Sequence, residues 1–225
     1  MNKTKMTAAG LCILAVVGCK TSTGTGALIG TGGGALLGAI VGKIAGNTAV
    51  GAAVGGAVGA GAGALIGKHM DKVKAQAAAE LENAQVEEIT DANGLSAVKV
   101  TFDAGILFAT NKADLNSKSK TELANFSTVL KNNPDLSVDI YGHTDNTGND
   151  GINIPLSNKR AQSVVNYLKS CGVKAGQFQK VEGRGSSEPV ASNSTASGRQ
   201  QNRRVEVYMY ASKAMIDAAN NGTLN

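Results

Sequence analysis

Glycine recurs at every fourth position in two stretches near the start of the chain, and four residues separate the stretches. The positions are Gly26, Gly30, Gly34, Gly38, Gly42 and Gly46, then Gly51, Gly55, Gly59, Gly63 and Gly67. This spacing places the glycines on one face of an α-helix. Each glycine destabilises a solvated helix by about 1 kcal/mol relative to alanine, so the eleven together would cost about 10 kcal/mol in water. Free-standing helices in water are therefore not expected.

The aliphatic residues between these glycines favour a helical hairpin in a membrane. A face of small residues lets helices pack closely in a bilayer, where lipid-facing leucine and isoleucine are tolerated. Residues 26–46 would span roughly 30 Å as a helix, the thickness of the hydrocarbon core. The second stretch is shorter and would insert only in part. The pattern resembles the glycine-zipper hairpins of bacterial envelope proteins. A disordered tether is the alternative, although such linkers favour serine over leucine and keep no register.

The first nineteen residues read "MNKTKMTAAGLCILAVVGC". A basic start, a short apolar core and a small residue before Cys19 have the layout of a secretory signal peptide, and the core is short for a membrane span. "VVGC" resembles the bacterial lipobox, which implies cleavage before Cys19 and attachment of an acyl lipid such as palmitate to it. An ordinary signal peptide with an incidental cysteine is the alternative.

Net charge and cysteine usage exclude several classes of protein. The formal charge is +5, and removal of Lys3 and Lys5 with the signal peptide would lower it to +3, too little to indicate nucleic-acid binding. With Cys12 removed and Cys19 lipidated, Cys171 is left alone. A single thiol forms no internal disulfide, and its neighbours have no metal-ligand spacing. No metal or cofactor is expected.

Beyond the zipper, strand and helix patterns alternate. Runs at 86–89 and 95–102 flank "DANG", a strong hairpin signal. A helix ending before Pro134, a strand at 136–142, a helix at 155–170 and strands at 178–182 and 203–210 follow. This order predicts an α+β fold, a small mixed β-sheet with helices packed on one face.

These patterns predict six segments along the chain. They are a signal peptide (1–18), a lipidated N-terminus (19–23), a membrane-associated glycine zipper (24–67), a polar helical linker (68–88), a folded domain (89–211) and a C-terminal tail (212–225), which includes a short amphipathic helix.

Four motifs occur in order within the folded domain. They are "YGHTDNTG" at 141–148, "NIPLSNKRAQSVVNYL" at 153–168, "GRG" at 183–185 and "GRQQNRRVEV" at 198–207. Over residues 95–210 the chain resembles the OmpA-like C-terminal domain, which peptidoglycan-associated lipoproteins and flagellar stator proteins share. The resemblance implies an OmpA C-terminal-like fold that binds peptidoglycan.

Two of these motifs place opposite charges near each other. Asp145 follows a strand in a polar loop, and Arg160 lies on the next helix, with Asn153 on the same face. A carboxylate and a guanidinium across a gap match the ammonium and carboxylate of an amino acid, such as the free end of diaminopimelate in a peptidoglycan stem. A structural ion pair between Asp145 and Arg160 is the alternative.

The family resemblance implies the same two residues as diaminopimelate ligands and adds three others. Thr147 and Asn153 match positions that line the pocket, and Arg203 matches the first arginine of the family's Asn-Arg-Arg. Strand alternation puts Arg203 on the face of Val205 and Val207, toward the groove. His143 is expected to pack or to make a local hydrogen bond. Thr110 and Asn111 are expected at the pocket edge.

The prediction is therefore a non-enzymatic tether between a membrane and peptidoglycan. A wall enzyme would need a nucleophile or a metal cluster, which two histidines and one spare cysteine do not provide. An oligomeric channel or stator built on the zipper helices is the alternative, and a homo-oligomer is open. Lys20 after Cys19 resembles an outer-membrane sorting signal, with the folded domain in the periplasm, whereas a helical hairpin favours the inner membrane.

Overall fold

A computed structural model describes residues 58–109 and 111–224. The signal peptide, Cys19, the first glycine stretch and Thr110 lie outside the described residues. The described elements are α1 (Ala60–Glu80), β1 (Ala84–Thr90), β2 (Ser96–Asp103), α2 (Ala104–Leu107), α3 (Ser117–Asn132), β3 (Leu136–Gly142), α4 (Asp150–Ser170), the 3₁₀ helix η1 (Ala175–Gln177), β4 (Phe178–Gly183), α5 (Ala196–Asn202), β5 (Arg204–Ala211) and α6 (Lys213–Asn220).

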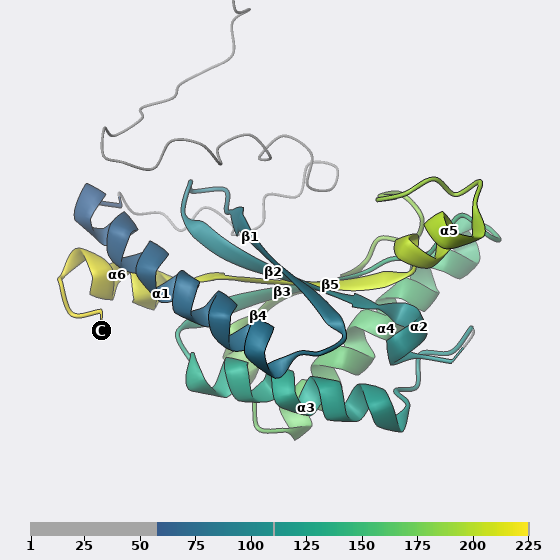
Figure 1. Ribbon diagram of the computed structural model, residues 1–225, viewed down its shortest axis with the longest axis horizontal. Helices are drawn as coiled ribbons and strands as arrows, with labels where there is room; N and C mark the ends of the chain where they lie inside the picture. Colours follow the sequence, from purple (N-terminus) through teal and green to yellow (C-terminus); the bar gives the residue numbers. More distant parts are fainter. Residues whose placement is uncertain (1–57, 110, 225) are drawn as a thin grey trace, which may run out of the picture. The chain divides into compact units, whose positions relative to one another are not determined.

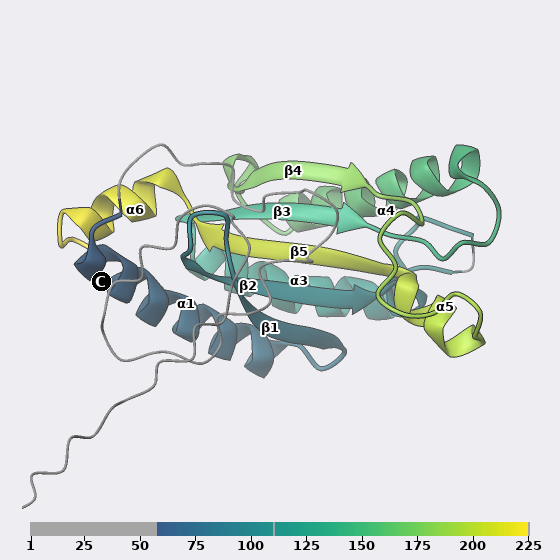
Figure 2. The ribbon, with the colours of Figure 1, turned by 90° about the horizontal axis from the view of Figure 1, so that it is seen from above.

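Five strands form one mixed sheet in the order β1-β2-β5-β3-β4 (Figure 2). All neighbours are antiparallel except β3 and β4, which are parallel and joined by α4. The last strand, β5, is inserted between β2 and β3 and is buried along its whole length. The carboxyl ends of β3 and β4 therefore lie beside the beginning of β5.

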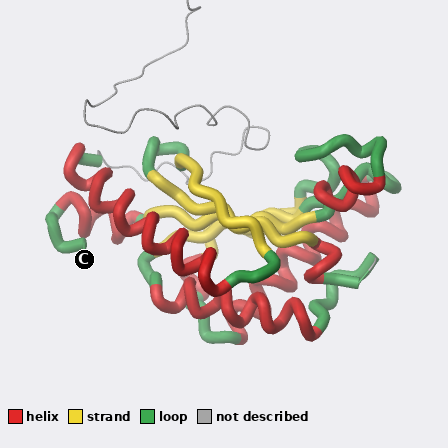
Figure 3. Tube along the Cα trace, in the orientation of Figure 1, coloured by secondary structure: helices red, strands yellow, loops and turns green. Residues whose placement is uncertain are grey.

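Helices α1, α3 and α4 lie on one face of the sheet (Figures 1 and 3). Their apolar stripes and the facing residues of the strands form one hydrophobic core, which includes Phe102, Phe126, Ile140 and Leu168. The rings of Phe102 and Phe126 pack edge to face at 5.6 Å between centroids. The predicted fold class, a small mixed sheet with helices on one face, is confirmed.

The opposite face of the sheet carries a smaller cluster of tyrosines. Tyr141, Tyr208 and Tyr210 are buried there, and the rings of Tyr141 and Tyr208 lie 5.7 Å apart, edge to face. The Tyr210 hydroxyl donates a 3.0 Å hydrogen bond to Asp139. Burial raises the pKa of the Asp139 carboxyl above its usual value, despite the hydrogen bonds it accepts. Both faces of β5 are therefore packed, one by helices and one by polar aromatic side chains.

The start of the folded domain differs from the sequence prediction, because α1 is part of the core. Its residues Ala62, Ile66, Met70, Val73 and Ala77 are all buried in the main cluster. The expected polar linker at 68–88 is thus a docked helix followed by β1, which pairs along its length with β2. The buried face of α1 is hard to recognise in the sequence, because Ile66, Met70 and Val73 are its only large apolar residues and the remaining composition is rich in Ala, Lys and Glu.

The second glycine stretch also differs from the prediction at its end. The last three glycines face the domain: a Cβ added to Gly59, Gly63 or Gly67 would lie 3.6 to 4.0 Å from side chains of Asn220, Leu95 and Ser96. The backbone N–H of Gly59 donates a 3.1 Å hydrogen bond to Asn220 Oδ1. The distances from an added Cβ are ordinary van der Waals distances, so the packing of α1 beside α6 and the β1–β2 turn would accept alanine at these positions. Within residues 58–109 and 111–224, no helix is long and apolar enough to cross a membrane.

One helix begins earlier than expected, and the short amphipathic helix expected in the C-terminal segment is present. The helix expected at 155–170 begins at Asp150, so Pro155 lies inside α4. Proline is common at the first position of a helix, so a helix that starts at Pro155 agrees with the sequence, but the structure adds residues before it. The C-terminal segment forms α6, whose Met215, Ile216 and Ala219 join the main core. The folded domain therefore runs from α1 to α6.

We predict that Ile66→Ala lowers the free energy of unfolding by about 2–4 kcal/mol, because it removes a fully buried side chain between α1 and the sheet. The neighbouring Leu65 is 38% exposed, and Leu65→Ala should change this free energy by less than about 1 kcal/mol. Urea unfolding followed by circular dichroism measures both. Equal, small effects would show that α1 is not docked.

Candidate functional site

The predicted site residues come together at one end of the sheet, opposite the end where α6 and the start of α1 lie (Figures 1 and 2). Three segments meet there. They are the loop 143–149 after β3, the beginning of α4, and the segment 184–203 between β4 and β5. Because β3 and β4 are parallel and β5 runs against them, both strand ends and the start of β5 share this edge.

Two glycines bring α4 against the strand ends. A Cβ on Gly142 would lie 2.2 Å from the backbone oxygen of Ser157, and one on Gly183 would lie 2.3 Å from the backbone nitrogen of Asn158. No side chain fits at either position without displacing the helix. Ser157 Oγ also accepts a 3.0 Å hydrogen bond from the backbone of Gly185. The polar face of α4 is thereby held close to the loop that carries Asp145.

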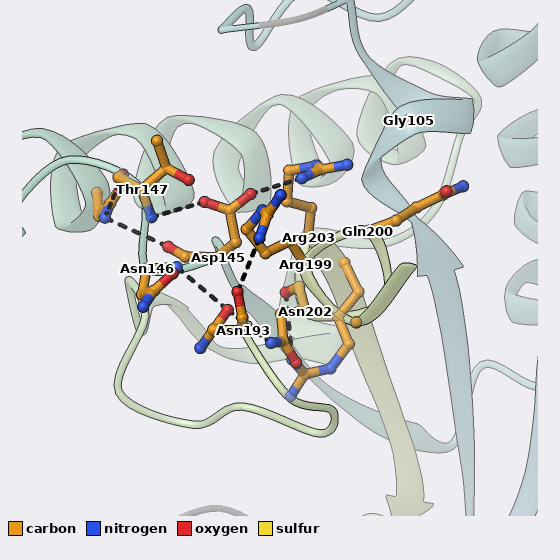
Figure 4. A network of polar contacts seen from close by, with 12 residues as sticks. Gly105, Asp145, Asn146, Thr147, Asn193, Arg199, Gln200, Asn202 and Arg203 are labelled. Carbon is orange, nitrogen blue, oxygen red and sulfur yellow. Dashed lines mark hydrogen bonds and ion pairs between the residues drawn. The ribbon is translucent and has the colours of Figure 1, made fainter. Parts of the chain in front are cut away.

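Asp145 is buried, with 7% of the residue exposed, and it is paired with Arg203. Arg203 Nη1 donates a 2.5 Å hydrogen bond to Asp145 Oδ2, and the backbone N–H of Thr147 donates a 2.8 Å bond to Oδ1 (Figure 4). Burial opposes ionisation of Asp145, but the hydrogen bonds from Arg203 and Thr147 outweigh it and lower its pKa. The carboxylate is therefore ionised at neutral pH.

Asn153 fixes the shape of the Asp145 loop. This buried side chain projects from the first turn of α4, and its Nδ2 donates to the backbone oxygens of Thr147 at 3.1 Å and of Asp145 at 3.4 Å. Thr147 itself is exposed at the rim of the loop. The two residues are where the resemblance implies, beside Asp145.

Arg160 lies deeper, with 4% of the residue exposed. Its Nε donates a 3.1 Å hydrogen bond to the backbone oxygen of Lys112, and its guanidinium lies 5.2 Å from the centre of the Phe108 ring. Burial, and next the charge of Arg203, lowers the pKa of Arg160, whereas the charge of Asp145 opposes this change. Within the described residues, no hydrogen bond uses the two terminal nitrogens of Arg160.

The structure changes the expected pairing of charges. Asp145 makes its ion pair with Arg203, and Asp145 and Arg160 are not within 4 Å of each other in the described part of the chain. The alternative of a structural Asp145–Arg160 ion pair is therefore not what the structure shows. The site instead combines one carboxylate with two guanidinium groups. It can receive an ammonium at Asp145 and a carboxylate at Arg160.

Sequence reasoning missed the residues that hold the 184–203 segment over the site. Asn193 Oδ1 accepts hydrogen bonds from Asn202 Nδ2 at 2.8 Å and from the backbone of Asn146 at 3.3 Å (Figure 4). Arg199 Nη1 donates to the backbone oxygen of Asn193 at 2.9 Å. In the sequence, only the Asn and Ser content between the predicted strands at 178–182 and 203–210 indicated such hydrogen bonding. Of the two expected edge residues, Asn111 has a left-handed φ of 55° and Thr110 lies outside the described residues.

His143 packs, as expected, behind the site and is 1% exposed. In the described ranges, no group of three or more His, Cys, Asp or Glu side chains is placed to hold a metal ion.

Comparison with known proteins identifies this region. Residues 107–203 match the model of the OmpA family. These residues are an OmpA family domain. The match contains Asp145, Thr147, Asn153, Arg160 and Arg203, and it leaves α1, β1, β2, β5 and α6 outside. Residues 1–71 match the YMGG-like Gly-zipper model, which covers both glycine stretches and extends into α1.

Individual relatives share this OmpA domain. The peptidoglycan-binding protein ArfA of Mycobacterium tuberculosis is 45% identical over 112 residues, which are 50% of this chain and 34% of ArfA. The probable lipoprotein YiaD of Escherichia coli is 34% identical over 142 residues, 63% of each chain. The chain thus spans about a third of ArfA and less than two thirds of YiaD. The solved cell wall anchor of the T6SS from Pseudomonas aeruginosa is 32% identical, with a TM-score of 0.50 over 65% of this chain and 96% of that one.

We predict that Arg203→Gln raises the pKa of Asp145 in the OmpA domain, because the variant loses the charged donor. Carboxyl-carbon NMR titration measures it. The ion pair contributes stability above the ordinary aspartate pKa of about 3.9, and the contribution is lost as pH falls through the lower folded value. The stability difference between wild type and variant should therefore disappear at acid pH. Arg199→Gln is the matched control, and an unchanged Asp145 pKa in Arg203→Gln would contradict the prediction.

Proposed function

We propose that the chain is a cell-envelope lipoprotein that binds peptidoglycan without catalysis and ties a membrane to the wall. The observation that carries this proposal is the site at the end of the OmpA domain, where the buried Asp145 carboxylate pairs with Arg203 and lies close enough to Arg160 for the three charges to influence one another. The relatives support it, since ArfA is a peptidoglycan-binding protein and the solved neighbour is a cell wall anchor.

The ligand that fits these groups is the free end of diaminopimelate in the stem peptide. Its carboxylate would bind the terminal nitrogens of Arg160, which have no hydrogen bond within the described residues. Its ammonium would bind Asp145, whose lowered pKa keeps the carboxylate charged. Because Arg203 already occupies one oxygen of Asp145, the ammonium would share that carboxylate with Arg203 or displace it. Arg203 thus sets how strongly Asp145 attracts a cation.

This chemistry also distinguishes between types of wall. A stem peptide with lysine in place of diaminopimelate offers the ammonium but lacks the carboxylate. Its binding would leave the buried Arg160 guanidinium without an anionic partner, and an unpaired buried charge is costly. The site should therefore retain diaminopimelate-containing wall in preference to lysine-containing wall.

We predict that Asp145→Asn and Arg160→Gln each abolish retention of the full-length protein on purified sacculi that contain diaminopimelate. Removal of one charged group should weaken binding at least about 30-fold, the effect of roughly 2 kcal/mol. Cosedimentation from detergent solution measures the bound fraction. Asp150→Asn and Lys159→Gln are matched controls, because both side chains are exposed on α4.

Two results would count against the proposal. One is retention of both site variants at the wild-type level. The other is equal retention of the wild-type protein on sacculi that contain lysine in place of diaminopimelate.

The anchor is proposed from the sequence, with a lipid on Cys19 and the first glycine stretch inserted in the bilayer. The match to the Gly-zipper model and the similarity to YiaD, a probable lipoprotein, support this anchor. The outer membrane with the OmpA domain in the periplasm is the proposed location. An oligomeric channel or stator is less favoured, because Gly59, Gly63 and Gly67 face the folded domain.

We predict that Cys19→Ser shifts the protein from the lipidated to the unprocessed or soluble form, because it removes the acyl acceptor. Labelling with a fatty-acid analogue and separation of inner and outer membranes measure lipidation and location together. Replacement of Cys171 by serine is the control and should leave both unchanged. Full labelling of Cys19→Ser would disprove the lipid site.

A further inference from the structure

A buried cluster of charged side chains lies directly behind the proposed binding site. It consists of His143 at the end of β3, Glu188 in the loop after β4, and Arg204 and Glu206 on β5. The side chains of His143, Arg204 and Glu206 are each less than 5% exposed, and that of Glu188 is 11% exposed. No part of the proposed ligand chemistry uses these groups.

Arg204 has partners at all three guanidinium nitrogens. Its Nε donates to Glu206 Oε1 at 2.7 Å, and its two terminal nitrogens donate to the backbone oxygens of Asn202 and Glu188. Glu206 Oε2 accepts a 2.6 Å hydrogen bond from the Tyr208 hydroxyl. Arg204 therefore joins β5 to both ends of the segment that folds over the site.

His143 lies between the two carboxylates. Its Nε2 is 3.4 Å from Glu206 Oε2, and its Nδ1 is 3.9 Å from Glu188 Oε2. Within the described residues, neither ring nitrogen makes a hydrogen bond. A neutral imidazole has one N–H and one lone pair, so one nitrogen would direct its lone pair at a carboxylate. A protonated ring has an N–H for each, and it balances the charges of the cluster.

The same residues connect the two segments that carry the site. The backbone N–H of His143 donates to the oxygen of Arg204 at 2.9 Å, and that of Thr144 donates to Gly185 at 2.9 Å. Asp145 follows His143 by two residues, and Arg203 immediately precedes Arg204. A change in the cluster therefore acts on the relative position of Asp145 and Arg203.

We infer that His143 is a positioning residue for the diaminopimelate site: its protonated ring draws Glu188 and Glu206 together and holds the Asp145 and Arg203 segments in the ligand-binding arrangement. Affinity for the ligand then falls as pH rises and His143 loses its proton. This inference rests on the proposed function and adds to it a dependence on pH near neutrality.

The other groups that face the ring keep their charge over this range. Burial opposes ionisation of Glu206, but the facing His143 ring and the Arg204 guanidinium outweigh it and lower its pKa. Burial and the charge of Glu206 raise the pKa of the Tyr208 hydroxyl, which stays neutral. Histidine is the side chain whose charge ordinarily changes between pH 5 and 8.

Solvent can reach two members of this cluster through a cavity in the surface. Arg204 and Glu206 line a cavity of about 510 Å³, whose other walls include Lys99 and Thr101 of β2 and Val190 of the loop. Protons can therefore exchange with water although the His143 ring is buried.

The test is calorimetric titration of the full-length protein in detergent with free diaminopimelate at pH 6.0 and 8.0. For the wild type we expect Kd to rise about fivefold between the two, the low end of typical coupling between sites. Binding near neutral pH should also take up protons, which appears as a dependence of the binding enthalpy on the ionisation enthalpy of the buffer. In His143→Gln both effects should be absent, and Glu188→Gln should reduce both.

Controls separate a positioning role from a structural one. The chain has two histidines, so His69→Gln is the matched variant and should retain the wild-type pH profile. Thermal unfolding shows whether His143→Gln is folded, and the proton uptake of the wild type needs no variant at all. A wild-type Kd that is equal at both pH values, without proton uptake, would overturn the inference and leave the proposed function intact. Failure of diaminopimelate to bind at either pH would overturn both.

Discussion

The contact on which the site depends is the approach of the α4 backbone to Gly142 and Gly183. A methyl group at either glycine would overlap the helix backbone, so α4 can lie this close to the ends of the parallel strands β3 and β4 only because both positions are glycine. This contact places Asn153 and Arg160 beside the loop that leaves β3. The insertion of β5 next to β3 then brings Arg203 to the same edge. Three segments distant in sequence become one site through backbone packing.

The charges of the site are arranged so that none is buried without a partner or neighbour. Asp145 has Arg203 and a backbone N–H, and Arg160 has a carbonyl and the face of Phe108. Arg204 is shielded separately by Glu206, on the other side of β5. Consecutive arginines thus have different partners: Arg203 pairs with Asp145, and Arg204 pairs with Glu206 in the buried cluster. Strand alternation alone separates the two roles.

Sequence patterns predicted the sheet, its helices and the convergence of Asp145, Asn153, Arg160 and Arg203, because alternation, helical spacing and four ordered motifs all agreed. They did not predict which arginine pairs with Asp145, since that depends on side-chain reach across β5 and α4. The docking of α1 was missed because Ala62 and Ala77 contribute little hydrophobic signal to its stripe. Glycines at four-residue spacing are also ambiguous, since a face of small residues is compatible both with close packing between membrane helices and with the packing of α1 on the folded domain.

Because α1 packs directly on the sheet, it determines how the domain would respond to a mechanical pull on its N-terminal end. Helix α1 begins beside α6, and the proposed ligand site lies at the other end of the strands (Figure 1). A pull between membrane and wall would act along the length of the sheet, so that the hydrogen bonds between strands are sheared together rather than opened one after another. Because β5 is the central strand and Arg203 immediately precedes it, a load on the proposed ligand site would reach the strand that is buried along its whole length.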